Sequence, residues 1–178
     1  MLRRGPGERA GASVRPLRVL GHRIVSTATT DGDSPEVGPK SPTGRQVLFA
    51  CTHNAGRSQI AAAFFNLLAD PARARAISAG TDPVARVHPE VVAVMREVGI
   101  DLAGARPRHL TAELAGTAEL LITMGCGERC PVVPGARRED WPIEDPRGQS
   151  LKRVREIRDA IRKRVETLVA AEALARLV

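Results

Sequence analysis

The stretch at residues 47–58, Val-Leu-Phe-Ala-Cys-Thr-His-Asn-Ala-Gly-Arg-Ser, decides both the fold and the chemistry that we expect of this 178-residue chain. Its first four residues form a short apolar run, which is typical of a buried parallel strand that ends at Cys51. From Ser58 to Asp70, apolar residues recur at helical spacing, at Ile60, Phe64, Leu67 and Leu68. The stretch therefore predicts a strand, a loop and a helix in succession.

The loop after Cys51 has the residue types of an oxyanion site. A thiol becomes a nucleophile when positive potential favours its thiolate, and the loop N–H groups with the helix start supply that potential. The same N–H groups form a nest for a tetrahedral oxyanion, to which Arg57 adds a planar fork. Gly56 allows a tight turn, Ser58 is placed to donate a hydrogen bond to Cys51, and Asn54 braces the loop. We therefore expect the anion to bind at Thr52, His53, Asn54, Ala55, Gly56, Arg57 and Ser58. If Cys51 were only a small buried side chain, the following Asn-Ala-Gly-Arg-Ser run would have no explanation.

The histidines have weaker signals. His53 could act as a general base, but thiolate chemistry in such a loop requires none, so we favour a structural role or a place at the rim of the substrate site. His88 and His109 lie near predicted helix starts, where caps or loop contacts are expected.

The rest of the chain alternates strands with helices. Further strands are predicted at 74–78, 119–124 and 138–143, and helices at 89–98, 111–115 and from Ser150 onwards. The last helix should bury a stripe made of Leu151, Val154, Ile161, Val165 and Leu168. This alternation predicts an α/β domain with a parallel sheet and right-handed crossovers. Because ligands bind at the carboxyl ends of such strands, the loops after Cys51 and Met124 should share one edge.

Residues 1–45 are expected to be a disordered basic extension, with the catalytic domain at 46–178. The extension holds eight basic and four acidic residues, so it carries +4 of the net charge of +7, and it is rich in Gly, Pro, Ser and Thr. A short apolar patch at 17–25 could form a local turn or strand. With no Tyr, one Trp and three Phe, the chain lacks the aromatic residues that stack on bases, which argues against nucleic-acid binding.

No run approaches the ~20 apolar residues that a membrane-spanning helix needs, and the first residues lack a secretory pattern. We therefore expect a cytoplasmic protein without a membrane segment. In a reducing compartment, three cysteines indicate redox or catalytic roles rather than a disulfide framework. Cys126 and Cys130 have a Cys-x3-Cys spacing. A zinc site would need four ligands and no further Cys or His lies nearby, which leaves an inert pair or a redox pair.

Taken together, these runs resemble a known family. Cys51-x5-Arg57-Ser58 early in the domain and Asp145-Pro146 late in it are similar to the low-molecular-weight tyrosine phosphatases, and more closely to the arsenate reductases built on that fold. Further matching runs are 78–81, 123–127, 130–131 and 139–141, within a resemblance that covers roughly 46–172. It implies a four-stranded parallel sheet flanked by helices in a flavodoxin-like three-layer arrangement.

The resemblance also implies an activity, the reduction of arsenate to arsenite in arsenic detoxification and resistance. Asp145 is then the general acid, with Glu144 as its neighbouring competitor and a simple turn before the last helix as the alternative. Cys51 attacks arsenic, Cys126 attacks Cys51 and releases arsenite, and Cys130 moves the disulfide to Cys126–Cys130. The implied electron donor is thioredoxin, with mycothiol as the alternative. No bound cofactor is implied, and we expect a monomer.

Other functions stay open from the sequence. A tyrosine phosphatase of this fold needs aromatic walls for its substrate, yet the residues after Asp145-Pro146 are Arg147 and Gly148, and the chain has no Tyr. An arsenate-mycothiol transferase, or a non-catalytic oxyanion-binding domain whose basic tail contacts a partner, are further alternatives. Some relatives bind potassium through a Glu in the helix after the loop; Ala62 stands at that position here, so we predict no metal site.

Overall fold

The computed structural model describes residues 44–131 and 134–176. The strands are β1 (Arg45–Cys51), β2 (Ala74–Gly80), β3 (Leu120–Met124) and β4 (Arg137–Asp140). The helices are α1 (Arg57–Leu68), α2 (Pro89–Arg96), α3 (Ala112–Gly116) and α4 (Leu151–Ala171), with a 3-10 turn, η1 (Gly127–Arg129), after β3. The expected extension and its apolar patch at 17–25 lie outside the described residues, except for Gly44 and Arg45, the second of which is the first residue of β1.

The four strands form one parallel sheet in the order β2-β1-β3-β4, which confirms the predicted fold class. β1 is central and pairs with both β2 and β3, so that Cys51 lies opposite Gly80 on one side and Met124 on the other. The strands that carry Cys51, Gly80 and Met124 thus end together. Both loops of chemical interest leave the sheet at this edge, as the parallel topology predicts.

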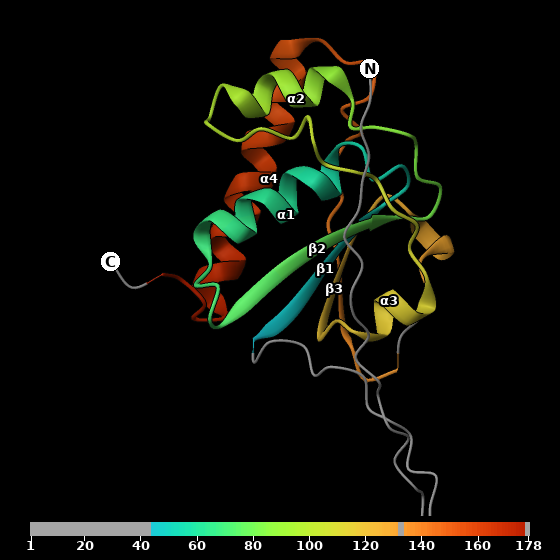
Figure 1. Cartoon of the computed structure of the whole chain (residues 1–178), viewed down its shortest axis with the longest axis vertical. Coiled ribbons are helices and arrows are strands. Elements are labelled where there is room, and N and C mark those ends of the chain that lie inside the picture. Colours follow the sequence, from blue (N-terminus) through green and yellow to red (C-terminus); the bar gives the residue numbers. More distant parts are fainter. Residues whose placement is uncertain (1–43, 132–133, 177–178) are drawn as a thin grey trace, which may run out of the picture. The chain divides into compact units, whose positions relative to one another are not determined.

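Alternation along β1 separates two cores. Val47, Phe49 and Cys51 face the core that contains α1, α2 and α4, whereas Leu48 and Ala50 face a smaller core with Ala115 of α3. Figure 1 shows the sheet between these two layers, with α1 and α4 on one side and α3 on the other. Within the described residues, no helix is long and apolar enough to span a membrane.

The structure agrees with the predicted starts of the helices, but it differs from the prediction in which residues their buried faces contain. Thr111 and Ser150 cap α3 and α4, because their side chains accept hydrogen bonds from the amides three residues later. The expected stripes are wrong at Leu67 and Leu151, which are 52% and 45% exposed. Each lies within two residues of an end of its helix. The buried apolar residues missing from those stripes are Ala61, Ala62 and Phe65 in α1 and Ile157 and Val169 in α4.

Ile161 and Leu151 in α4 should differ in how much each contributes to the free energy of unfolding. Ile161 is completely buried in the larger core, so its truncation to alanine should lower the free energy of unfolding by about 2–5 kcal/mol. Leu151→Ala removes an exposed side chain and should cost less than about 0.5 kcal/mol. Urea unfolding followed by circular dichroism measures both. Equal losses for the two variants would contradict the burial of the α4 stripe.

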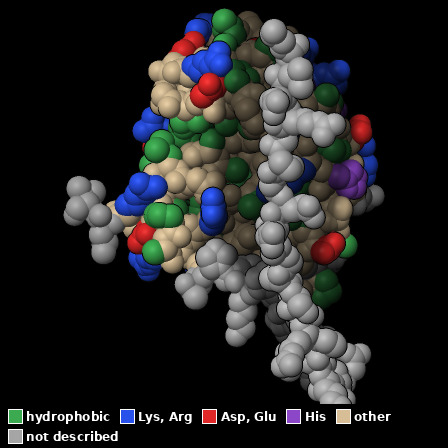
Figure 2. Space-filling view, in the orientation of Figure 1, with side chains coloured by type: hydrophobic (Ala, Val, Ile, Leu, Met, Phe, Trp, Pro, Cys, Tyr) green, Lys and Arg blue, Asp and Glu red, His purple; other side chains and the backbone are tan. Residues whose placement is uncertain are grey.

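Charged side chains on the visible face of the domain do not form a single patch of one sign. Figure 2 shows Lys and Arg side chains at several separate places on the visible face, with acidic side chains nearby. Several arginines of the described domain are paired with acidic side chains. Arg155, for example, donates to Glu97 from both Nε and Nη2 at 2.7–3.1 Å and joins α4 to the end of α2. Pairs this exposed contribute about 0–1 kcal/mol each.

Candidate active site

The backbone of the loop between β1 and α1 is held from outside. The carbonyls of Cys51, Thr52, His53 and Ala55 accept hydrogen bonds from the amides of Thr81, Asp82, Val84 and His88, at 2.8–3.2 Å. In a trans peptide the N–H points opposite to the C=O, so the amides that follow these carbonyls turn toward the loop centre. The segment 81–88 therefore shapes a nest of N–H donors, as the oxyanion interpretation requires.

A short hydrogen-bonded chain reaches the thiol of Cys51. Ser58 Oγ lies 3.0 Å from Cys51 Sγ, and Asn54 Nδ2 donates to the same Oγ at 2.8 Å. An amide nitrogen can only donate, so the hydroxyl must accept from Asn54, which leaves its own hydrogen free for sulfur. Ser58 is therefore within hydrogen-bond distance of Cys51, as predicted, and its hydroxyl hydrogen is free to point at the sulfur.

Asn54 braces the loop in a left-handed conformation. Its φ is +50°, a region that asparagine tolerates better than most residues. The fully buried side chain accepts from the amide of Arg108 at 2.9 Å, and Gln59 Nε2 donates to its backbone carbonyl at 3.1 Å. Gly80 packs so closely beneath it that a Cβ there would lie 2.8 Å from Asn54 N. The bracing role predicted for Asn54 is visible here, and Gln59, Gly80 and Arg108 are supports that we did not foresee.

Arg57 and Asp145 form an ion pair across 88 residues of sequence. Arg57 Nη2 donates to Asp145 Oδ2 at 2.6 Å, and Nη1 donates to the carbonyl of Ile143 at 3.3 Å. Arg57 is buried, whereas the Asp145 side chain is 37% exposed. The two residues that we proposed for anion binding and acid catalysis are therefore neighbours. Glu144, the competitor for the acid role, is instead paired with Arg153, away from Arg57.

Pro146 and Gly56 determine where the Asp145 loop sits. A Cβ on Gly56 would lie 2.6 Å from Pro146 Cγ, so only glycine allows the loops to touch. Asp145 Oδ1 accepts from the amide of Arg147 at 3.0 Å, which fixes one carboxylate oxygen.

Two histidines lie beside this ion pair. His53 Nδ1 is 4.0 Å from Asp145 Oδ2, and the ring of His53 meets that of His88 edge to face, with centroids 6.4 Å apart. Burial lowers the pKa of His88, and this desolvation outweighs the opposing influence of Glu90 and Asp145. His88 is the N-cap residue of α2 but makes no side-chain capping bond, so the expected cap is replaced by a ring contact.

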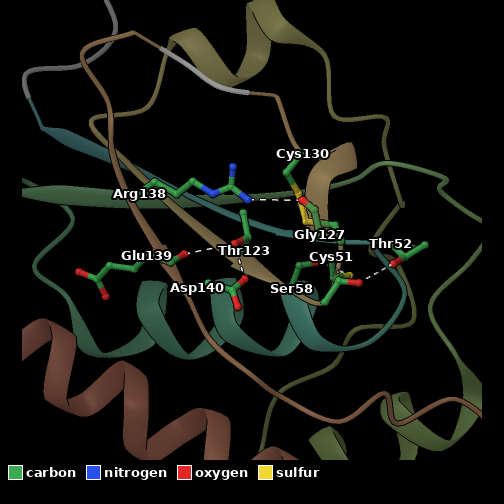
Figure 3. The surroundings of a disulfide bond; sticks show 11 residues. Cys51, Thr52, Ser58, Thr123, Gly127, Cys130, Arg138, Glu139 and Asp140 are labelled. Carbon is green, nitrogen blue, oxygen red and sulfur yellow. Dashed lines mark hydrogen bonds between the residues drawn. A yellow bond between two sulfur atoms is a disulfide. The ribbon is translucent and has the colours of Figure 1, made fainter.

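Cys126 and Cys130 are joined by a disulfide that spans η1, with Cα atoms 5.9 Å apart. Both are buried, at 3% and 2% exposure, in the smaller core, whereas Cys51 belongs to the larger core and is a free thiol. Figure 3 shows the disulfide and Cys51 in one neighbourhood at the end of the sheet. The structure thus pairs the two distal cysteines and leaves Cys51 unpaired.

Gly125 links the two loops and had no predicted role. Its carbonyl accepts from Thr52 Oγ1 at 3.2 Å, its φ is +73°, and a Cβ there would lie 2.5 Å from Arg57 Nη1. The run Thr-Met-Gly-Cys-Gly at 123–127 carried the resemblance, but nothing in it showed that the glycine touches an arginine 68 positions earlier.

Gly125→Ala should therefore push the Arg57 guanidinium out of place. We expect the affinity for inorganic phosphate to fall at least about tenfold, the value of one hydrogen bond to a charged group. Gly127→Ala is the matched control, because its φ is also positive, at +55°, yet nothing lies within 4 Å of its added Cβ. Isothermal titration calorimetry measures both variants. Equal weakening in the two would show that backbone strain, not contact with Arg57, is responsible.

The fold and this site define a class: a parallel α/β domain with a buried free cysteine at the end of its first strand and a buried arginine at the start of the helix that follows. Residues 46–177 match the model of the low molecular weight phosphotyrosine protein phosphatase family, and the chain belongs to that family. The match leaves out the extension and covers the described domain.

Several relatives carry a more specific name. A putative arsenate reductase of Halobacterium salinarum is 38% identical over 128 residues, or 67% of this chain and 87% of that protein. The glutaredoxin arsenate reductase of Synechocystis is 37% identical over 71% of this chain and 97% of that protein. Among solved structures, the thioredoxin-dependent arsenate reductase of Corynebacterium glutamicum is 37% identical with a TM-score of 0.64. The match covers 75% of this chain but only 63% of that one.

Proposed function

We propose that this chain is an arsenate reductase that uses Cys51 as nucleophile and the Cys126–Cys130 pair as its redox store. The observation that carries the proposal is the combination of a free Cys51 in the N–H nest with a Cys126–Cys130 disulfide at the same sheet edge. A phosphatase needs the nest alone, because water completes its reaction. A reductase must also receive two electrons, and two neighbouring thiols can supply them.

The first step uses the residues around Arg57. Arsenate binds the inward N–H groups and the guanidinium, and the Cys51 thiolate attacks arsenic. Asp145, which takes up a proton from solvent once it has left Arg57, delivers that proton to the leaving hydroxyl group, which departs as water and leaves a Cys51 sulfur–arsenic(V) bond. In the structure Asp145 is bound to Arg57 Nη2, so this pair must open when arsenate takes the guanidinium.

The following steps pass two electrons to arsenic. The Cys126 thiolate attacks Cys51 Sγ; a sulfur–sulfur bond forms, the electrons of the sulfur–arsenic bond go to arsenic, and arsenite leaves. The Cys130 thiolate then attacks Cys126 and frees Cys51 as a thiolate. The disulfide ends on Cys126–Cys130, the same bond that the structure contains. An external thiol reductant must reduce it before the next cycle.

We propose a thioredoxin-type protein as that reductant. The relative from Corynebacterium glutamicum is thioredoxin-dependent by name, while the Synechocystis relative is named for glutaredoxin. Neither of these two is named for mycothiol, so that alternative draws no support from them. A protein reductant also suits a disulfide that is 2–3% exposed, because docking can open the loop around it.

A direct assay tests the proposed function. Reduced protein is given arsenate in three parallel reactions, with a thioredoxin system, a glutaredoxin system or mycothiol, and arsenite is measured by arsenic speciation. A fourth reaction supplies an aryl phosphate without reductant. We expect catalytic arsenite formation with thioredoxin. Hydrolysis of the aryl phosphate with no arsenite from any donor would assign the chain to the phosphatase branch instead.

A further inference from the structure

Three buried polar side-chain atoms have no hydrogen-bond partner among the described residues: Thr81 Oγ1, Arg57 Nε and His53 Nδ1, of which the last two belong to residues that contact Asp145. Buried polar atoms in folded proteins are nearly always paired with protein or ordered water, so both nitrogens are open to a further hydrogen-bond partner. Both atoms lie beside Asp145, which binds Arg57 Nη2 at 2.6 Å and stands 4.0 Å from His53 Nδ1. We therefore consider the two unpaired nitrogens together, as possible partners of the substrate and of Asp145.

Arg57 Nε is explained by the substrate. A guanidinium binds an oxyanion best through two parallel N–H groups, and Nε with Nη2 forms one such edge. Nε has no hydrogen-bond acceptor among the described residues, whereas Nη2 donates to the Asp145 carboxylate. A second anion at that edge would also repel this carboxylate, so substrate binding must displace Asp145 from Arg57.

After displacement from Arg57, the Asp145 side chain has a second partner within reach, His53 Nδ1. Its Oδ1 accepts from the amide of Arg147 at 3.0 Å, which lets Oδ2 turn while Oδ1 remains anchored. The His53 ring is the fixed partner, because its own carbonyl accepts from the amide of Val84 and the ring packs edge to face against His88. A movement of about 1 Å brings Oδ2 from 4.0 Å to hydrogen-bond distance of His53 Nδ1.

We propose that His53 is a positioning residue for the general acid: when the oxyanion takes Arg57, Asp145 transfers its Oδ2 contact from Arg57 Nη2 to His53 Nδ1–H. This inference rests on the proposed function. A side chain that is 37% exposed and released from Arg57 would otherwise turn toward solvent. The His53 contact keeps it over the leaving oxygen instead. Most of the rate that a general acid contributes depends on such placement.

Kinetic coupling tests this role. We expect His53→Ala to lower kcat for arsenate roughly tenfold, a part of the 10²–10⁴-fold that a general acid contributes. In the Asp145→Asn background the same replacement should have no further effect, because His53 acts through Asp145. His53→Asn places an amide nitrogen near the Nδ1 position and should restore most of the rate, whereas His53→Gln places it near Nε2 and should not. His109→Ala, which changes an exposed histidine outside the site, should behave as wild type.

Losses that multiply in the double variant, or equal rates for His53→Asn and His53→Gln, would overturn the inference. If the wild type makes no arsenite, the proposed function fails, and a second measurement still decides the role of His53. A crystal structure of the wild type with inorganic phosphate should show Asp145 within about 3.2 Å of His53 Nδ1 and separated from Arg57 Nη2. Asp145 still bound to Arg57 above a phosphate would overturn the proposal.

Discussion

Arsenite formation should stop when Cys51 is replaced by serine. The expected fall in kcat exceeds about 10⁴-fold, as when the nucleophile of a catalytic unit is removed. A serine hydroxyl in this nest stays protonated at neutral pH. It is a far weaker nucleophile than a thiolate, and an oxygen cannot take part in a disulfide relay. Arsenic speciation after incubation with arsenate and a thioredoxin system measures the loss.

Cys51→Ser should lose arsenate reduction but keep its fold and its affinity for an oxyanion. Serine fits where cysteine was, and the carbonyls that orient the nest are bound by segment 81–88 and not by the thiol. We therefore expect a melting temperature close to that of the wild type and affinity for inorganic phosphate within about threefold, a difference below 1 kcal/mol. If Cys51→Ser retains turnover above background while folded, the nucleophile is another residue and the proposed site is wrong.

The arrangement around Cys51 could be predicted because its signals are local. A strand, a loop with a Cys-x5-Arg spacing and a helix follow each other within 47–68, and parallel topology then brings the loop after Met124 to the same edge. The roles of Ser58 and Asn54 were also predicted from their places in this loop. Local order along the chain was enough, because these residues contact one another within seven positions.

Contacts between distant segments could not be predicted. The Arg57–Asp145 pair joins residues that had each been chosen, but only the folded chain shows that they bind each other when no anion is present. Gly125 and Arg108 were missed, because a glycine that touches an arginine, or a backbone amide that binds Asn54, leaves no pattern in the sequence. Periodicity likewise misplaced Leu67 and Leu151, since it locates a helix face but not where the covering layer ends.

The second large effect is expected at Cys126. Cys126→Ser should lose catalytic arsenite formation by at least about 100-fold, because the external donor must replace a thiol of the same chain, carried by the loop that leaves the same sheet edge as Cys51. The first step needs only the loop N–H groups, Arg57 and Asp145. Cys51 should therefore still react with arsenate, and the Cys51–arsenic intermediate should accumulate. Arsenite assays with thioredoxin measure the loss, and Cys130→Ser is the matched variant with one thiol fewer at the other end of η1.

Counting arsenite per protein separates the two thiols in a reaction without any reductant. Reduction of one arsenate takes two electrons, which is one disulfide. Cys130→Ser keeps Cys51 and Cys126, so it should release one arsenite per protein and stop with a Cys51–Cys126 disulfide. Cys126→Ser should release none, since the Cys51–Cys126 disulfide that Cys130 attacks in the proposed order cannot form. Peptide mapping by mass spectrometry identifies the disulfide in each case.

The positions of the thiols explain why the order should be this one. Cys126 directly follows Gly125, whose carbonyl accepts a hydrogen bond from Thr52, so its backbone is joined to the Cys51 loop one residue away. Cys130 lies beyond η1 and is already within disulfide distance of Cys126. A burst of one arsenite from Cys126→Ser would mean that Cys130 attacks Cys51 directly. The relay would then run in the opposite order, and the disulfide seen in the structure would form by attack of Cys126 on Cys130.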